Sequence, residues 1–339
     1  MQRIGNKWIT GLVGLLVIFL SLGWFASRIV TWQIASGISK HCESCILKAE
    51  STHFSLRPTS LVLSSVTFHS GNAAWTAFDA QAQQLVIPFS FLSFFKKEAK
   101  LGLIHFQGLY VTITEGGVKT PPSPVNDEEE ESAWRYAIQG VSIAQGKFEY
   151  ARTYGATTAR LHVANITGSM GPVGTTPELK DQIAHAEATG SLEESGSFLL
   201  TIDSAIFSKI LNAKIGLQLN NQNLGDISPF FETSGQIKIN GDLIDGKSDV
   251  EIQDKKLVAW VRARYKNLAI KFSKGKDRSA MVAFFSNLIQ AFKLRSSDLK
   301  SRPDNQIRTV KLERKKDETI VLFVLHGMKD AALGVATDN

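Results

Sequence analysis

The sequence predicts a mainly β protein, built on an antiparallel sheet and preceded by one N-terminal transmembrane helix. Three observations lead to this prediction: an uncharged apolar run near the N-terminus, apolar residues that alternate with polar ones over most of the remaining chain, and turn signals between the alternating segments. The composition of the 339 residues, 43% hydrophobic and 21% charged, excludes a disordered chain and a polytopic membrane protein.

The uncharged run extends from Trp8 to Ala26. About 20 apolar residues cross the ~30 Å hydrocarbon core of a bilayer as a helix, so the run has the length of a membrane anchor. Arg3 and Lys7 precede it, and positive charge on this side orients the N-terminus toward the cytoplasm. A cleaved signal peptide is the alternative, because Ala26-Ser27 could belong to a cleavage site. In both cases the rest of the chain lies outside the cytoplasm, which argues against a nucleic-acid partner.

After the anchor, apolar residues recur with period two, which is typical of strands with one apolar and one polar face. Dipeptides such as Gln145-Gly146, Ser195-Gly196, Asn240-Gly241 and Asp245-Gly246 predict turns between them. These signals give roughly 12 to 14 strands with few helical interruptions, so we expect antiparallel pairing. Pairs that show the alternation are Leu61 and Leu63, Val66 and Phe68, Leu85 and Ile87, Leu101 and Leu103, Leu109 and Val111, Leu217 and Leu219, and Ile237 and Ile239.

One segment interrupts the pattern. Residues 119–132 contain three prolines and five consecutive acidic residues, which cannot pack in a core, so they predict a solvated loop. The chain therefore divides into the cytoplasmic N-terminus and anchor at 1–29, a first β segment at 30–118, this loop, and the remaining β segment at 133–339.

Two segments predict helices. Phe89–Lys97 follows a proline and is expected to form a short helix between strands. Residues 277–294 predict an amphipathic helix, with Asp277 as its N-cap. This helix either packs on the sheet, covers an apolar groove as a lid, or lies in a membrane interface. Its apolar face consists of Met281, Phe284, Phe285, Leu288, Ile289 and Phe292.

The net charge is divided unevenly along the chain. Residues 1–254 hold 19 Lys and Arg against 24 Asp and Glu, a net charge of −5, whereas residues 255–339 hold 19 against 8, a net charge of +11. Such a basic third favours an anionic partner, and outside the cytoplasm this partner is expected to be a lipid phosphate.

Gly241–Ser248 matches the phosphate-loop pattern G-x-x-x-x-G-K-[ST]. That motif requires a helix directly after it, whereas the residues that follow alternate as a strand, and Asp242 and Asp245 would place negative charge beside a phosphate. We interpret the segment as a hairpin turn and expect no nucleotide partner.

Cys42 and Cys45 form a C-x-x-C pair close to the anchor. A local disulfide is the simplest interpretation in an oxidising compartment, with free thiols and a redox or metal role as alternatives. The seven histidines show no ligand spacing that would complete a zinc site, so we expect no metal and no cofactor. No arrangement of serine, histidine and carboxylate typical of a hydrolase appears, and we expect a protein that is not an enzyme.

Three stretches resemble the AsmA-like family of bacterial envelope proteins: residues 54–68, 82–113 and 224–257, the last with the cadence Gly-x-Ile-x-Ile-x-Gly-x-Leu. The resemblance implies an elongated, curved antiparallel sheet that forms an apolar groove, held by a single-pass anchor in the bacterial inner membrane with most of the chain in the periplasm. It also implies a role in handling phospholipids. Because this chain is shorter than many family members, bridging two membranes would require oligomers or other envelope proteins.

The alternating aliphatic residues named above are therefore expected to line a groove for lipid acyl chains, without covalent chemistry. A structural or scaffold protein of envelope or outer-membrane assembly, with an ordinary closed core, is the alternative function.

Overall fold

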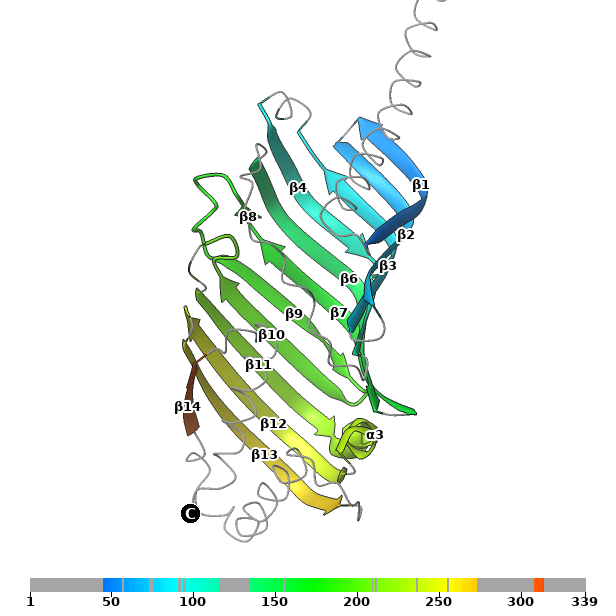
Figure 1. Cartoon of the computed structure of the whole chain (residues 1–339), viewed down its shortest axis with the longest axis vertical. Coiled ribbons are helices and arrows are strands. Elements are labelled where there is room, and N and C mark those ends of the chain that lie inside the picture. Colours follow the sequence, from blue (N-terminus) through cyan, green and yellow to red (C-terminus); the bar gives the residue numbers. More distant parts are fainter. Residues whose placement is uncertain are drawn as a thin grey trace, which may run out of the picture.

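The computed structural model describes residues 45–56, 58–72, 76–90, 93, 96–115, 135–154, 156–208, 210, 212–235, 237–254, 256–272 and 308–313. These residues form one large sheet of fourteen strands and one helix, α3 (Leu224–Gly235) (Figure 1). The strands are β1 (Ile46–Leu56), β2 (Thr59–Asn72), β3 (Thr76–Pro88), β4 (Glu98–Gln107), β5 (Tyr110–Glu115), β6 (Arg135–Tyr154), β7 (Thr157–Gly171), β8 (Val173–Gly174), β9 (Ala184–Leu192), β10 (Gly196–Ser204), β11 (Asn212–Asn223), β12 (Ile237–Gln253), β13 (Lys256–Phe272) and β14 (Arg308–Glu313).

The prediction of a mainly β protein is confirmed, and neighbours in the sheet largely follow the order of the chain. The order is β1-β2-β3-β4-β6-β7-β9-β10-β11-β12-β13-β14, with β5 between β3 and β6 and with β8 beside β6. Figure 1 shows these strands side by side in an elongated, twisted sheet. The described part therefore has one layer of strands.

The sheet is mixed, so the expectation of purely antiparallel pairing is wrong at one place. β6 runs parallel to β4 and β5, whereas the other named pairs are antiparallel. β4 and β5 both pair with β3 and are separated at Gly108. The chain then returns from Glu115 to Arg135, where β6 begins beside the start of β4. A parallel pair needs such a long crossover. The predicted loop 119–132 belongs to this connection and lies outside the described residues.

One face of the sheet is apolar along its whole width. Side chains of directly paired residues lie on the same face, so the register shows which residues share it. We call this surface the apolar face. From β1 to β9, one row of paired residues on it is Leu47, Phe68, Ala80, Val111, Phe148, Val163 and Leu192. From β9 and β10 to β13, two neighbouring rows are Phe198, Leu219, Gly246 and Ala263, and Ala188, Leu200, Leu217, Ser248 and Val261.

Several strands bend where a residue adopts a left-handed backbone conformation. Ser65 in β2, Gln145 in β6 and Asn165 in β7 have φ angles of 49°, 55° and 54°. At such a residue the alternation of apolar and polar positions shifts by one. Leu63 and Val66 are three positions apart, so strict alternation would place them on opposite faces, but both are buried in one cluster. These bends keep the apolar side chains on one face along a curved strand.

The turns predicted at Gln145-Gly146, Asn240-Gly241 and Asp245-Gly246 are wrong, because all three dipeptides lie inside long strands. In β12, register shifts occur after Asn240 and after Leu243. Gly241 has φ +122°, and a Cβ atom there would lie 2.8 Å from the backbone oxygen of Asn267. Turn-forming residues therefore serve as bulges here. Gly241–Ser248, which matches the phosphate-loop pattern, lies inside β12 and is followed by more of the same strand. It is therefore not a phosphate loop, and the hairpin turn that we expected there is wrong.

Two clusters of buried side chains lie toward the two edges of the sheet. The first has Leu61, Leu63, Val66 and Ala82 at its centre, and the second has Ala213, Val250, Ile252, Leu257 and Ala259. Leu257 and Ala259 are 0% exposed. The apolar face is therefore closed to water at the second cluster and nearly so at the first.

Helix α3 was not predicted from the sequence, and it contains Pro229 and two glycines, which disfavour a helix. Asn223 caps it through a hydrogen bond from the Gly225 backbone N–H to the Asn223 side chain, 2.8 Å long. The Phe230 ring packs on the Tyr150 ring of β6, with 5.8 Å between centroids. Tyr150 lies on the apolar face, so α3 covers this face near the lower ends of β6 and β7 (Figure 1).

Candidate functional site

The centre of the apolar face, over β7 to β11, is the first candidate site. Its side chains are half-buried, unlike those of the two clusters. Among the described residues no second sheet faces it, and α3 is the single named helix. The members of this central surface are Leu161, Val163, Leu192, Phe198, Leu200, Ile202, Leu217 and Leu219. We refer to them as the open centre.

The fourteen residues predicted to line a groove have different environments. Leu61, Leu63, Val66 and Ile239 are buried, and Leu103 is 53% exposed. Leu85, Ile87 and Leu109 pack against the first cluster, and Phe68, Leu101, Val111, Leu217 and Leu219 are half-buried. The Ile237 side chain lies outside the described set. The structure thus places many of these residues on one face, but several of them fill a core.

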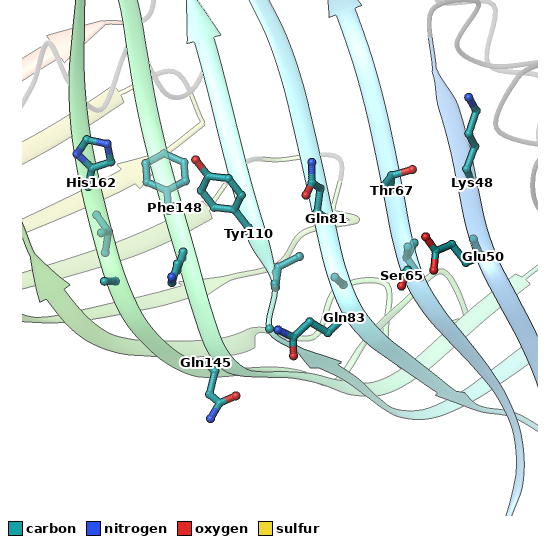
Figure 2. A pocket seen from close by; sticks show the side chains of 18 of the residues that line it. Lys48, Glu50, Ser65, Thr67, Gln81, Gln83, Tyr110, Gln145, Phe148 and His162 are labelled. Carbon is teal, nitrogen blue, oxygen red and sulfur yellow. The ribbon is translucent and has the colours of Figure 1, made fainter.

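One cavity is lined mainly by polar residues, which the sequence did not lead us to expect. It has a volume of about 1110 Å³ and extends over β1, β2, β3, β5, β6 and β7. Figure 2 shows Lys48, Thr67, Gln81, Tyr110 and His162 in a row across these strands. The first four are linked by register, so they share one face, opposite the rows of the apolar face. Val66 and Leu109 are the predicted groove residues in its lining.

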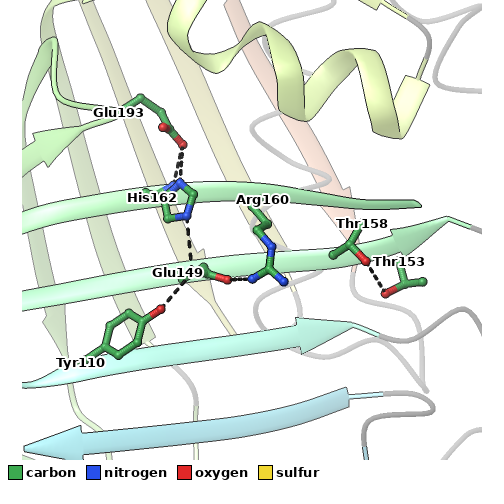
Figure 3. Close-up of polar contacts among 7 residues, drawn as sticks. All are labelled: Tyr110, Glu149, Thr153, Thr158, Arg160, His162 and Glu193. Atoms are coloured by element: carbon green, nitrogen blue, oxygen red, sulfur yellow. Dashed lines mark hydrogen bonds and ion pairs between the residues drawn. The ribbon is translucent and has the colours of Figure 1, made fainter. Parts of the chain in front are cut away.

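A cluster of ionisable groups borders this polar cavity (Figure 3). Glu149, 7% exposed, accepts a hydrogen bond from the Tyr110 hydroxyl (2.9 Å) and forms an ion pair with Arg160. His162 lies between two carboxylates, with Nε2 3.4 Å from Glu149 and Nδ1 3.3 Å from Glu193. The Glu193 carboxylate also accepts the His162 backbone N–H at 2.6 Å. The β9–β10 turn is thereby attached to β7.

The electrostatics of this cluster indicate a structural role. Burial alone would raise the pKa of Glu149, but the hydrogen bond from Tyr110, the Arg160 guanidinium and the nearby His162 lower it below its ordinary value. A carboxyl group that transfers protons near neutral pH needs a raised pKa. Glu149 instead stays ionised, and Tyr110 and Arg160 stabilise its charge.

A second cavity, of about 820 Å³, is more apolar. It lies at the upper ends of β2, β3, β4 and β6, and its apolar walls are Pro58, Pro88, Phe89, Leu101, Ala137, Ile138, Pro172 and Leu179. The exposed side chain of Lys100 also borders it. Of the predicted groove residues, Leu101 lines this cavity.

The described basic residues of β12 and β13 are partly neutralised. Arg262 and Arg264 both pair with Asp245, and the Lys247 ammonium lies 3.4 Å from Asp249 and 5.2 Å from the centre of the Trp260 ring. Most of the basic third lies outside the described residues, as do the predicted anchor and the helix predicted at 277–294. The apolar residues of that helix, Met281, Phe284, Phe285, Leu288, Ile289 and Phe292, are therefore not placed.

Cys45 is disulfide-bonded. Cys42 lies outside the described residues, so its pairing with Cys45 stays a prediction. Within the part of the chain that the structure describes, no group of three or more histidine, cysteine and carboxylate side chains is arranged to hold a metal ion. No helix in that part of the chain has the length and apolar character needed to cross a bilayer.

The sequence reasoning missed the Glu149 cluster because its members are far apart in the chain. A signal was nonetheless present. Glu149 stands between Phe148 and Tyr150, and His162 stands between Leu161 and Val163, so each ionisable residue alternates with apolar neighbours. Such residues belong to the opposite face of the same strands, but the pairing of strands cannot be obtained from the alternation.

No protein-family model matches the chain, and no curated protein matches it. The functional argument therefore depends on the geometry of the two faces and on the sequence.

Proposed function

We propose that the protein binds phospholipid acyl chains on the open centre of its apolar face and helps to transfer them in the bacterial envelope, without catalysis. In this proposal the run from Trp8 to Ala26 anchors it in the inner membrane and the sheet lies in the periplasm, as the resemblance to the AsmA-like family implies. Membrane lipids are the partners, with other envelope proteins at the ends of the sheet.

One observation carries the proposal: the apolar rows continue across the sheet, and their centre is half-buried in a single layer of strands. Leu200 and Leu217 are direct cross-strand partners there, and Phe198 and Leu219 form the next pair. Each acyl methylene removed from water on such a surface contributes about 0.8 kcal/mol.

The length of the sheet limits the mechanism. Twelve strands on the main path give eleven spacings of about 4.8 Å, or about 53 Å in total. One copy offers a surface for a few lipids, so transfer between membranes requires further copies or partner proteins.

The structural or scaffold alternative is favoured by the two buried clusters, which resemble an ordinary core. It predicts that the open centre carries no lipid and that a partner protein covers it.

The test is to purify the full chain in mild detergent and to measure co-purified lipid by mass spectrometry, followed by uptake of a fluorescent phospholipid. Leu217→Asp should reduce both several-fold, because it places a charge on the apolar face. Gln218→Asp, one position further on the opposite face, is the matched control and should change neither.

Leu217→Trp keeps the surface apolar but fills space above it, and it should lower uptake without unfolding the sheet. Absence of lipid from the unaltered protein, together with no uptake, would contradict the proposal and favour the scaffold alternative.

A further inference from the structure

Four large apolar side chains gather at the upper ends of β9, β10 and β11. They are Ile183 (63% exposed), Ile206 (51%), Phe207 (41%) and Ile210 (56%). They make up half of the eight exposed large hydrophobic residues in the described part of the chain. Scattered exposed apolar residues are ordinary, but a concentration at one place marks an interaction surface.

Two neighbouring loops bring these residues together. Ala184 pairs with Ser204, so the loop that ends at Ile183 and the loop that begins at Ala205 leave the sheet side by side (Figure 1, upper left). The Ser204 hydroxyl donates to the Asn212 backbone oxygen at 3.1 Å, which joins the two ends of the second loop. We call the four side chains the hydrophobic rim.

We infer that the hydrophobic rim inserts into the surface of a lipid bilayer. Four side chains that are 41–63% exposed offer less area than the ~800 Å² per partner of a stable protein interface. A bilayer needs no matching flat surface, because it surrounds each protruding apolar side chain separately. The inference concerns attachment to a membrane and does not require the open centre to carry lipid.

A membrane is within reach of the rim. Residues 27–44 separate the uncharged run from the first described residue, and 18 residues extend at most about 60 Å. β1 starts at the opposite end of the sheet from the rim, and its 11 residues cover about 37 Å along the strands. Seven spacings of about 4.8 Å separate β1 from β10 across the sheet, so the straight distance is about 50 Å. The connecting segment is therefore long enough to let the rim contact the same membrane that holds the anchor.

The rim also adjoins the apolar cavity. Leu179, in the wall of that cavity, and Ile183, in the rim, belong to the same loop and are four residues apart. Insertion of the rim would thus bring the mouth of an apolar cavity close to the bilayer.

The test uses the full chain carrying Ile210→Cys, labelled with an environment-sensitive fluorophore and reconstituted in vesicles of phosphatidylethanolamine and phosphatidylglycerol. We expect a blue-shifted, several-fold brighter emission that nitroxide-labelled lipids quench and aqueous iodide does not. Asn220→Cys is the matched control, because Asn220 is exposed near the other end of β11. Its label should stay accessible to iodide.

Ile183→Cys, labelled in the same way, tests the first loop and guards against a local effect of the Ile210 substitution. Iodide quenching at both rim positions equal to that at Asn220 would overturn the inference. Blue-shifted emission that lipid nitroxides fail to quench would overturn it as well, because it indicates burial against a protein. Neither result changes the lipid content measured for the open centre. Membrane insertion of the rim and lipid binding at the open centre can therefore be disproved independently.

Discussion

The apolar face has closed regions near the edges of the sheet and an open centre, although the alternating pattern is the same in all of them. Leu257 is 0% exposed, whereas Leu217, on the same face, is half-buried. The closed regions contain small residues such as Ala82 and Ala259 between the large ones. The comparison teaches that alternation determines which face is apolar but does not determine whether the side chains on that face are buried.

The centre is also stabilised from its other face. The Glu149 cluster links β6 to β7 and to the β9–β10 turn, and the His185 imidazole lies 2.7 Å from the Asp203 carboxylate across β9 and β10. We therefore expect apolar burial to stabilise the closed regions and polar pairs to contribute more in the centre.

The largest expected effect comes from truncating the same residue type in the two regions. Leu257→Ala should lower the free energy of unfolding by about 2–4 kcal/mol, because it leaves a cavity in a fully buried cluster. Leu217→Ala should cost about 1 kcal/mol or less, since its site is already open to solvent. Urea denaturation of the full chain in detergent measures both. Equal losses would show that the centre is packed like the closed regions.

A smaller effect is expected on the polar face. Glu149→Gln removes a buried charge that Arg160 and Tyr110 satisfy, and should cost about 1–3 kcal/mol at pH 7. Because the pKa of Glu149 is lowered in the folded state, its contribution is present above the ordinary value of 4.5 and is lost as the pH falls through the folded-state pKa.

The difference between the unaltered protein and Glu149→Gln should therefore shrink in acid, as followed by thermal unfolding at several pH values. Glu251→Gln is the control, since Glu251 is exposed and faces Lys214 in the same kind of cross-strand pair. If the stability difference between the two proteins does not change with pH, the loss comes from altered packing and not from the charge of Glu149.

The smallest effect concerns His185. The hydrogen bond to Asp203, with the charges of Asp203 and Glu187, raises the pKa of the imidazole against the smaller effect of desolvation. Its stabilising contribution is present below the ordinary pKa of 6.5 and is lost as the pH rises through the folded-state value. His185→Gln should thus lower the melting temperature slightly at pH 5.5 and by less at pH 8.5. A larger loss of melting temperature at pH 8.5 than at pH 5.5 would show that the His185–Asp203 pair does not stabilise the protein in this way.

The sequence predicted the β class and the faces of many strands, because alternation depends on neighbouring residues. It also held a signal for the bends, in the change of phase between Leu63 and Val66, which is visible without any structure. The parallel pairing of β6 could not be predicted, since it depends on where residues 116–134 return the chain. Helix α3 and the bulges of β12 were missed because Gly, Asn and Pro also occur in turns.

The candidate site was predictable only in part. The alternation indicated aliphatic residues on one face, but it could not show that Leu61 fills a core while Leu217 stays half-buried. The Glu149 cluster and the hydrophobic rim both depend on contacts between separate strands and loops, which no local pattern reports.

The most direct test of the central claim is photo-crosslinking from the two faces of one strand. A photoreactive amino acid at position 217 of the full chain, expressed in intact cells, should form adducts that mass spectrometry identifies as phospholipid. The same amino acid at position 218 should form few or none, because Gln218 lies on the opposite face. Lipid adducts of equal yield at both positions, or none at position 217, would contradict an acyl-chain surface at the open centre.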